Sequence, residues 1–272
     1  MDFITVTFAY KLMIWLIIAS VIGVYSHKAK FLDLGGLIAA MMIGTIIFIS
    51  GGLRWIAPLA LFFLLSSILT RLASSRQMNQ KVKHSPRTAK QVIANGGVAA
   101  AAALGYLFYP ETGMQLLFLG SLAAATSDTW STEIGSFSKR KPRMITTLRI
   151  VDKGASGGIT LTGSAGGIAG ALLLGLSGML IFTADSLSYY TSIAIYVVIF
   201  AGLFGNIIDS LVGALLQSKF VCGVCGTLTE NKLHCDEPTT HKSGIIFIDN
   251  EVVNFVCALS GGVLAFIAAQ NL

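Results

Sequence analysis

The stretch FITVTFAYKLMIWLIIASVIGVY, residues Phe3–Tyr25, decides the class of fold. Its one charged residue is Lys11, and no A-x-A-like cleavage site follows it, so we expect it to be retained rather than removed as a signal peptide. A bilayer core of ~30 Å needs ~20 apolar residues in a helix. Because unpaired backbone groups cannot face lipid, an apolar run of this length predicts a transmembrane helix.

The composition extends this conclusion to the whole chain. Of 272 residues, 54% are hydrophobic and 12% are charged, and the mean hydropathy is +0.75, whereas soluble domains carry roughly 25% charged residues. We therefore predict an all-α integral membrane protein in which residues 1–272 form a single polytopic domain of about eight transmembrane helices. The expected spans are Phe3–Tyr25, Leu34–Ile49, Trp55–Leu72, Gln91–Phe108, Met114–Trp130, Gly157–Phe182, Tyr190–Gln217 and Val252–Ala269. The second is short and could instead be re-entrant.

The positions of Lys and Arg predict the orientation. Positive charge is retained on the cytoplasmic side of a membrane protein, and 17 of the 19 Lys and Arg residues fall in alternate loops. The exceptions are Lys11 and Arg54. We therefore expect both termini outside and the basic loops in the cytoplasm, in a cell membrane. The net charge of +6 then reflects topology and lipid contact, not a nucleic-acid partner.

Asp209 is the clearest ionisable group within an expected span. Charged groups at such depth are costly and usually functional. Asn206, Ser210, Gly213 and Gln217 share its helix face by their spacing, so this stripe predicts a polar site. The alternative is that the stripe only joins helices through hydrogen bonds.

A second acidic group ends the fifth expected span, in SDTWSTEIGS at 127–136. Asp128 and Thr132 are one helical turn apart, with Glu133 close to the same face. Carboxylates and hydroxyls are ligands that Mg²⁺ prefers, usually shared with substrate phosphates. The sequence predicts a Mg²⁺ site here, unless these residues merely form a polar cap at the membrane surface.

Two further groups could bind phosphate. Glycines at the start of a helix let backbone N–H groups approach an anion, although glycines also serve close helix packing, as we expect for Gly166 and Gly170. The candidates in the basic loop and glycine-rich run are Arg143, Lys153, Gly154, Ser156, Gly157 and Gly158. The candidates where the fourth and eighth spans begin are Arg87, Lys90, Gln91, Asn95, Asn250 and Asn254.

The loop 218–250 carries Cys222, Cys225, His234, Cys235 and His241. Three thiols and two imidazoles are enough ligands for a tetrahedral zinc site. The alternative is reduced free thiols. Redox catalysis is disfavoured, because the CxxC does not stand at the strand-to-helix junction of a thioredoxin-like unit.

Six motifs together resemble a known family. They are RTAKQVIANGG at 87–97, SDTWSTEIGS at 127–136, KGASGGITLTG at 153–163, GNIIDSLVGALLQ at 205–217, CGVCG with HC at 222–235 and IDNEVVN at 248–254. As an ordered set, covering most of the chain, they look like the transmembrane protein nineteen family, whose plant and cyanobacterial relatives include phytyl-phosphate kinase. SDTWSTEIG with its basic loop also resembles, more distantly, the CTP-dependent polyprenol (dolichol and phytol) kinases.

The resemblance implies transfer of a γ-phosphoryl group from CTP or another nucleoside triphosphate to an isoprenoid monophosphate at the cytoplasmic membrane face. Asp128, Glu133 and Asp209 would then hold Mg²⁺ and form the catalytic centre. Lys153 and the glycine-rich run would bind nucleotide phosphates, and Arg87, Lys90 and Asn95 the lipid phosphate, with the prenyl tail among membrane lipids. The alternatives are a transporter or flippase for a phosphorylated lipid, and a structural scaffold.

Overall fold

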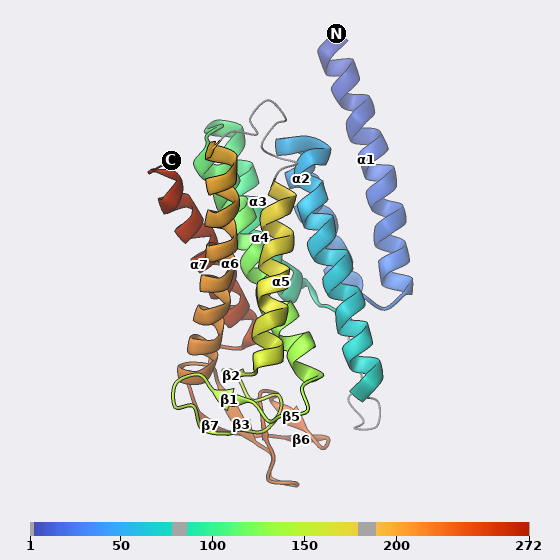
Figure 1. Ribbon diagram of the computed structural model, residues 1–272. Coiled ribbons are helices and arrows are strands. Elements are labelled where there is room, and N and C mark those ends of the chain that lie inside the picture. Colours follow the sequence, from blue (N-terminus) through green and yellow to red (C-terminus); the bar gives the residue numbers. More distant parts are fainter. Residues whose placement is uncertain (1–2, 78–85, 179–188, 272) are drawn as a thin grey trace.

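The computed structural model describes residues 3–77, 86–178 and 189–271, and within them the chain forms a helical bundle with short strands at one end (Figure 1). Every long helix coincides with an apolar run of the sequence. The helices are α1 (Phe3–Lys28), α2 (Leu34–Gln77), α3 (Ala89–Phe108), α4 (Thr112–Ser136), α5 (Leu161–Ser177), α6 (Tyr189–Leu215) and α7 (Asn250–Ala269).

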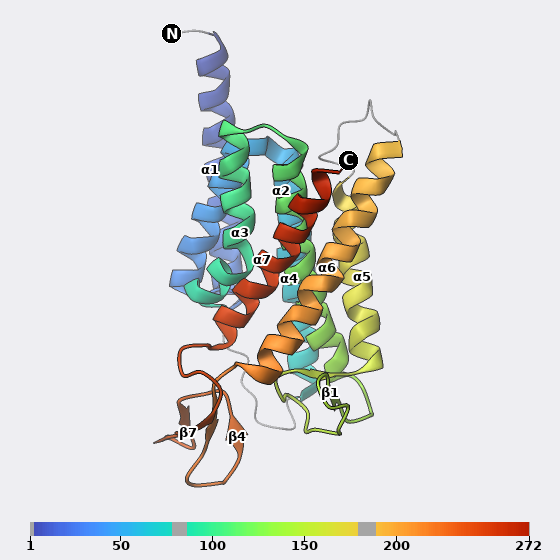
Figure 2. The ribbon, with the colours of Figure 1, turned by 90° about the vertical axis from the view of Figure 1, so that its left-hand side faces the viewer.

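Helix α2 combines two of the expected spans. Its 44 residues would extend about 66 Å as a straight helix, roughly twice the bilayer core. It is bent at Gly52, whose φ of 64° and ψ of −157° are not helical and are readily adopted only by glycine. Figures 1 and 2 show the chain bending there and running back along the bundle. The expected pair Leu34–Ile49 and Trp55–Leu72 therefore corresponds to the two arms of one bent helix.

Helix α4 is the centre of the bundle. It packs against α2, α3, α5, α6 and α7, and every residue from Phe118 to Ser127 is buried. Among the described residues, five helices are long and apolar enough to cross a membrane, namely α1, α2, α3, α6 and α7, and α4 is not one of them. Because its neighbours shield α4 from lipid, α4 can carry the Ser, Thr and Asp residues that a lipid-facing helix could not.

Glycine and alanine permit the close approach of α4 to its neighbours. A side chain at Gly166 or Gly170 on α5 would collide with the carbonyl oxygens of Trp130 and Thr126, which a Cβ would meet at 2.7 and 3.1 Å. The packing role expected for this GxxxG pair is confirmed. Such contacts bring the polar end of α4 beside α5 and α6.

The end of the bundle with the strands also carries the expected loop motifs. Helix α1 begins and α7 ends at the opposite end (Figures 1 and 2). β1 (Arg143–Met144) pairs with β2 (Gly158–Ile159); β3 (Lys219–Val221) lies between β4 (Leu228–Thr229) and β7 (Thr240–Ser243); and β5 (Leu233–His234) pairs with β6 (Glu237–Pro238).

The strands correct one boundary. The expected span Gly157–Phe182 begins too early, because Gly157 has a φ of 78° and residues 158–159 form β2. Thr160 caps α5 by accepting a hydrogen bond from the Gly163 N–H at 2.9 Å. Phe182 lies outside the described residues.

Candidate active site

The central feature is a pair of carboxyl groups, Asp128 on α4 and Asp209 on α6. Their side chains interact by a hydrogen bond, so two groups 81 positions apart in the sequence meet between adjacent helices. The second oxygen of Asp209, Oδ2, is buried and has no hydrogen-bond partner within the described structure. A buried carboxylate oxygen without a partner is costly, and a bound cation would compensate it.

Glu133 and Arg87 flank this pair. Glu133 lies on α4 and its charge acts on both Asp128 and Arg87. Burial lowers the pKa of the Arg87 guanidinium, and the negative charge of Glu133 raises it. The backbone of Arg87 is fixed by hydrogen bonds with Phe31 and Asp33 at the start of α2. The bundle thus places the Arg87 guanidinium beside the acidic groups.

Glu230 is a further acidic member that the sequence did not indicate. It lies in the Cys/His loop, yet its charge acts on Asp209, and its carboxylate accepts a hydrogen bond from the Ser156 hydroxyl. We define the acidic cluster as Asp128, Glu133, Asp209 and Glu230. No spacing rule joins Glu230 to a helix face, because a long loop brings it there.

A polar pocket of about 310 Å³ opens beside Glu230. Among the described residues its lining is amide, hydroxyl and acidic, with no Lys or Arg, and its carboxylates would repel a phosphate that arrived without a cation. It gathers the starts of α3 and α7 with the end of α6. The lining residues are Gln91, Gln217, Ser218, Glu230, Asn231, Asp249, Asn250 and Glu251. The amide Nε2 of Gln217 is buried and has no hydrogen-bond partner among the residues that the structure describes.

The glycine-rich run, expected to bind phosphate, serves helix packing in part. Gly157 packs against α6, where a Cβ would meet the Ser210 carbonyl oxygen at 2.7 Å, so this glycine serves close packing. Lys153 donates a hydrogen bond to the Ser138 carbonyl at 2.6 Å. Gly154, with a φ of 84°, is exposed and has no neighbour that a Cβ would meet.

Asn206 joins helices. Its side-chain amide donates to the hydroxyls of Ser127 and Ser131 on α4, at 3.1 and 2.7 Å. The alternative of an interhelical hydrogen-bonding stripe therefore describes Asn206, while Asp209, one turn further on, has the unpartnered oxygen that Asn206 lacks.

The remaining candidate residues lie around the same end of the bundle. Gln91 completes a capping box with Thr88 at the start of α3 and also lines the pocket. Arg143 donates to the Leu148 carbonyl at 2.8 Å and is exposed on β1. Lys90, Thr132 and Asn250 are exposed, whereas Asn95, Gly158, Ser210 and Asn254 are half-buried.

The Cys/His loop brings four of its five candidate ligands together. The ligand atoms of Cys222, Cys225, His234 and Cys235 all lie within 4.8 Å of one another. His241 is not among them, because its ring packs edge-on against Phe220 at 5.5 Å.

The three thiols of this loop do not ionise alike. Hydrogen bonds from the turn backbone lower the pKa of Cys222, and the hydrogen bond to Thr227 lowers the pKa of Cys225. The hydrogen bond with Cys225 raises the pKa of Cys235 to about 11. The Cys235 thiol, with a pKa of about 11, therefore stays protonated at neutral pH unless a cation joins the group.

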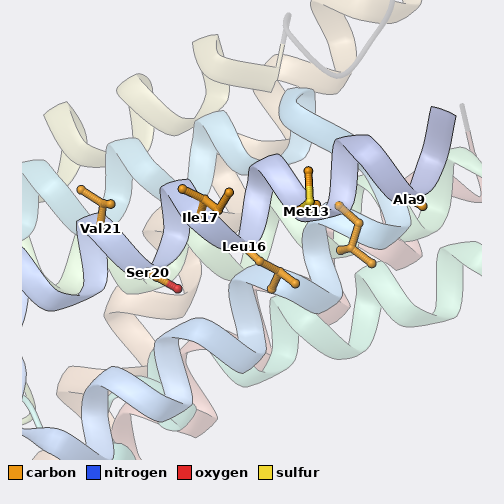
Figure 3. Close-up of a pocket in the computed structure, with 7 residues that line it drawn as sticks. Ala9, Met13, Leu16, Ile17, Ser20 and Val21 are labelled. Atoms are coloured by element: carbon orange, nitrogen blue, oxygen red, sulfur yellow. The ribbon is translucent and has the colours of Figure 1, made fainter. Parts of the chain in front are cut away.

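A second pocket, of about 550 Å³, is lined almost entirely by apolar side chains. It follows one face of α1 from Ala9 to Val21, and Figure 3 shows mainly aliphatic side chains along it. Ser20 is its one hydroxyl. No candidate site residue lines this groove.

The fold and the composition define a multi-pass integral membrane protein. The chain belongs to the family described as "Integral membrane protein DUF92", whose model matches residues 17–262. This match confirms the family membership inferred from the six motifs.

Curated relatives include proteins of an archaeon and a plant. The chain is 31% identical to "Uncharacterized membrane protein MJ0933" of Methanocaldococcus jannaschii over 93% of this chain and 92% of that one. It is 33% identical to "Protein PGR" of Arabidopsis thaliana over 96% of each. It is 24% identical to "Protein VTE6, chloroplastic" of the same plant over 88% of this chain and 66% of that protein. No solved structure matches significantly.

Proposed function

We propose that this protein transfers the γ-phosphoryl group of a nucleoside triphosphate to an isoprenoid monophosphate at the cytoplasmic face of the membrane. A phosphate oxygen of the lipid forms the new P–O bond. The bond between the γ-phosphorus and its bridging oxygen breaks, and the nucleoside diphosphate leaves. The observation that carries the proposal is the half-buried Asp128–Asp209 pair, in which Asp209 Oδ2 is buried and has no hydrogen-bond partner within the described structure.

The donor set fits a hard divalent cation. Mg²⁺ prefers carboxylate oxygens and is usually held by one or two of them together with substrate phosphates. Asp128 and Asp209 would hold it, with Glu133 adding negative charge nearby. When bound, Mg²⁺ would supply the positive charge that phosphoryl transfer needs. Without it, the acidic cluster would repel the triphosphate.

The other residues would position the two substrates. Arg87, beside Glu133 and near the apolar second arm of α2, is suited to a lipid phosphate, because a guanidinium can form two parallel hydrogen bonds with it. The amide-lined pocket beside Glu230 is suited to a nucleotide that arrives with its cation. A prenyl tail would remain in the bilayer, which accounts for the catalytic groups being carried by membrane helices.

The resemblance of the motifs supports the same activity. The six motifs resemble those of a family that includes phytyl-phosphate kinase.

The experiment is a substrate panel. Protein purified in detergent is incubated with Mg²⁺, each of the four nucleoside triphosphates and prenyl monophosphates of several chain lengths, and products are identified by mass spectrometry. The proposal predicts a prenyl diphosphate with at least one pair and none from the matching prenyl alcohol. Absence of diphosphate with every pair would contradict it. Movement of the lipid phosphate across liposomes without diphosphate would favour the flippase.

A further inference from the structure

The second cluster of ligating side chains lies in the segment 219–243, which we call the Cys/His module. It contains β3 to β7. Only two of its residues, Phe220 and Cys222, are buried, while Val224, Leu228 and Leu233 are at least half exposed. A segment this small with so little apolar burial lacks the core that folds a domain, and natural domains of this size depend on disulfides or metals.

Disulfides do not supply the missing constraint. All four cysteines of the chain, Cys257 included, are free thiols. The module is nonetheless ordered into two turns that face each other. In the first, the Gly226 N–H donates to the Cys222 carbonyl at 2.9 Å. In the second, Cys235 and Asp236 both have positive φ, of 54° and 61°.

The distances between ligand atoms match those around one zinc ion. Zn–S bonds of about 2.3 Å and Zn–N bonds of about 2.05 Å at a tetrahedral angle place sulfur and nitrogen about 3.5 Å apart. The Nδ1 atom of His234 lies 3.5 Å from the Cys225 sulfur and 3.3 Å from the Cys235 sulfur. Four ligands from two turns form the closed set of a structural site, with no position left open for a substrate.

We propose that Cys222, Cys225, His234 and Cys235 bind one structural zinc ion, which orders the Cys/His module and thereby holds Glu230 at the acidic cluster. Glu230 lies between the two ligand pairs in the sequence, and its carboxylate accepts the hydrogen bond from Ser156. Zinc binding therefore fixes a loop that would otherwise be free to leave the bundle. The zinc site stands apart from the proposed kinase activity; only the role of Glu230 rests on that activity.

The test measures metal directly. Protein purified without chelators is analysed for zinc by mass spectrometry, and we expect about one equivalent per chain. Cys225→Ser and His234→Ala should each lower zinc content at least ~10-fold. Cys257→Ser and His241→Ala are the matched controls and should keep it, since Cys257 is buried in α7 and His241 packs on Phe220.

A second measurement uses the unaltered protein, so it does not depend on whether the variants fold. Replacing zinc by Co²⁺ in the unaltered chain should give the intense visible bands of a tetrahedral ion and the near-ultraviolet thiolate-to-cobalt band of three sulfur ligands. No zinc in the wild-type protein, a Cys222–Cys225 disulfide, or zinc retained by Cys225→Ser would each overturn the proposal. These measurements do not use the prenyl-kinase assay, so failure of the zinc proposal can be distinguished from failure of the proposed function.

Discussion

The acidic cluster and the Cys/His module hold polar side chains together by different means. Asp128 and Asp209 are carried by α4 and α6, whose close packing fixes them whether or not an ion is bound. The Cys/His module has almost no buried core, so a metal ion bound by its ligands must stabilise the fold of the module. Removing Mg²⁺ should therefore abolish the function of the acidic cluster, whereas removing zinc should abolish the order of the Cys/His module.

The largest expected effect is on the acidic cluster. Asp128→Asn and Asp209→Asn should each lower turnover at least ~100-fold, because Asn keeps the size of the side chain but removes the charge that a Mg²⁺–nucleotide complex needs; a loss of a few kcal/mol of transition-state stabilisation has this effect. Turnover per folded molecule in the prenyl-phosphate assay measures it.

The fold of these variants should survive, since the helices and not the ion hold the pair. Asp209→Asn should keep or raise the stability of the metal-free protein, because the desolvation cost of a buried charge disappears. The matched control is Asp152→Asn, an exposed residue paired with Lys141. Near wild-type turnover in Asp209→Asn would remove that residue from the site.

Chelation should have the next largest effect, and it should be confined to the Cys/His module. Treatment with a strong zinc chelator should raise hydrogen–deuterium exchange across 219–243 at least ~10-fold, because few buried contacts remain to protect these amides. Peptides from 118–127 on α4 are the internal control and should not change. Equal protection of the module with and without chelator would contradict a structural role for metal.

A substitution that disturbs helix packing should lower the stability of the bundle without removing zinc from the Cys/His module. Gly166→Ala places a methyl group against the Trp130 carbonyl and Ile134, and overpacking of this kind costs about 1–3 kcal/mol. Thermal unfolding in detergent should detect the loss while zinc content stays constant. Gly97→Ala is the control, because its Cβ would meet only the Ile93 side chain at 3.4 Å. Unchanged stability in Gly166→Ala would show that α5 can move away from α4.

The smallest expected effect is at Asn206. Asn206→Ala loses two hydrogen bonds to Ser127 and Ser131, and hydrogen bonds between membrane helices average about 0.6 kcal/mol. We expect a loss of roughly 1 kcal/mol in the same unfolding measurement, with kinase turnover within a few-fold of wild type. A loss of turnover as large as that of Asp209→Asn would mean that Asn206 binds substrate.

The sequence predicted the features that depend on the length of apolar runs and on helical periodicity. Apolar runs predicted the helices, and the depth of Asp209 together with the turn from Asp128 to Glu133 predicted most of the acidic cluster. Gly52 was missed, because glycine is common in membrane helices and only its φ reveals the bend. Gly157 was assigned to a helix although its backbone is left-handed.

Other features depend on contacts that no local pattern encodes. Glu230 reaches Ser156 across 74 residues, and the pocket beside it combines the ends of three helices with a loop. His234 joins the ligand cluster and His241 does not, because the pairing of β3 with β7 places His241 opposite Phe220. The membrane side on which these features lie stays a prediction, which a cysteine introduced at Lys141 tests by its reactivity from outside.

Binding of a divalent ion by Asp128 and Asp209 is the central claim, and Mn²⁺ titration followed by electron paramagnetic resonance tests it most directly. Zinc-loaded protein with nucleotide present should bind one Mn²⁺ that Mg²⁺ displaces. Asp152→Asn should bind it equally well, and Asp209→Asn should lose at least ~10-fold in affinity. Equal Mn²⁺ binding by the wild-type protein and Asp209→Asn would contradict the assignment of the acidic cluster as the metal site.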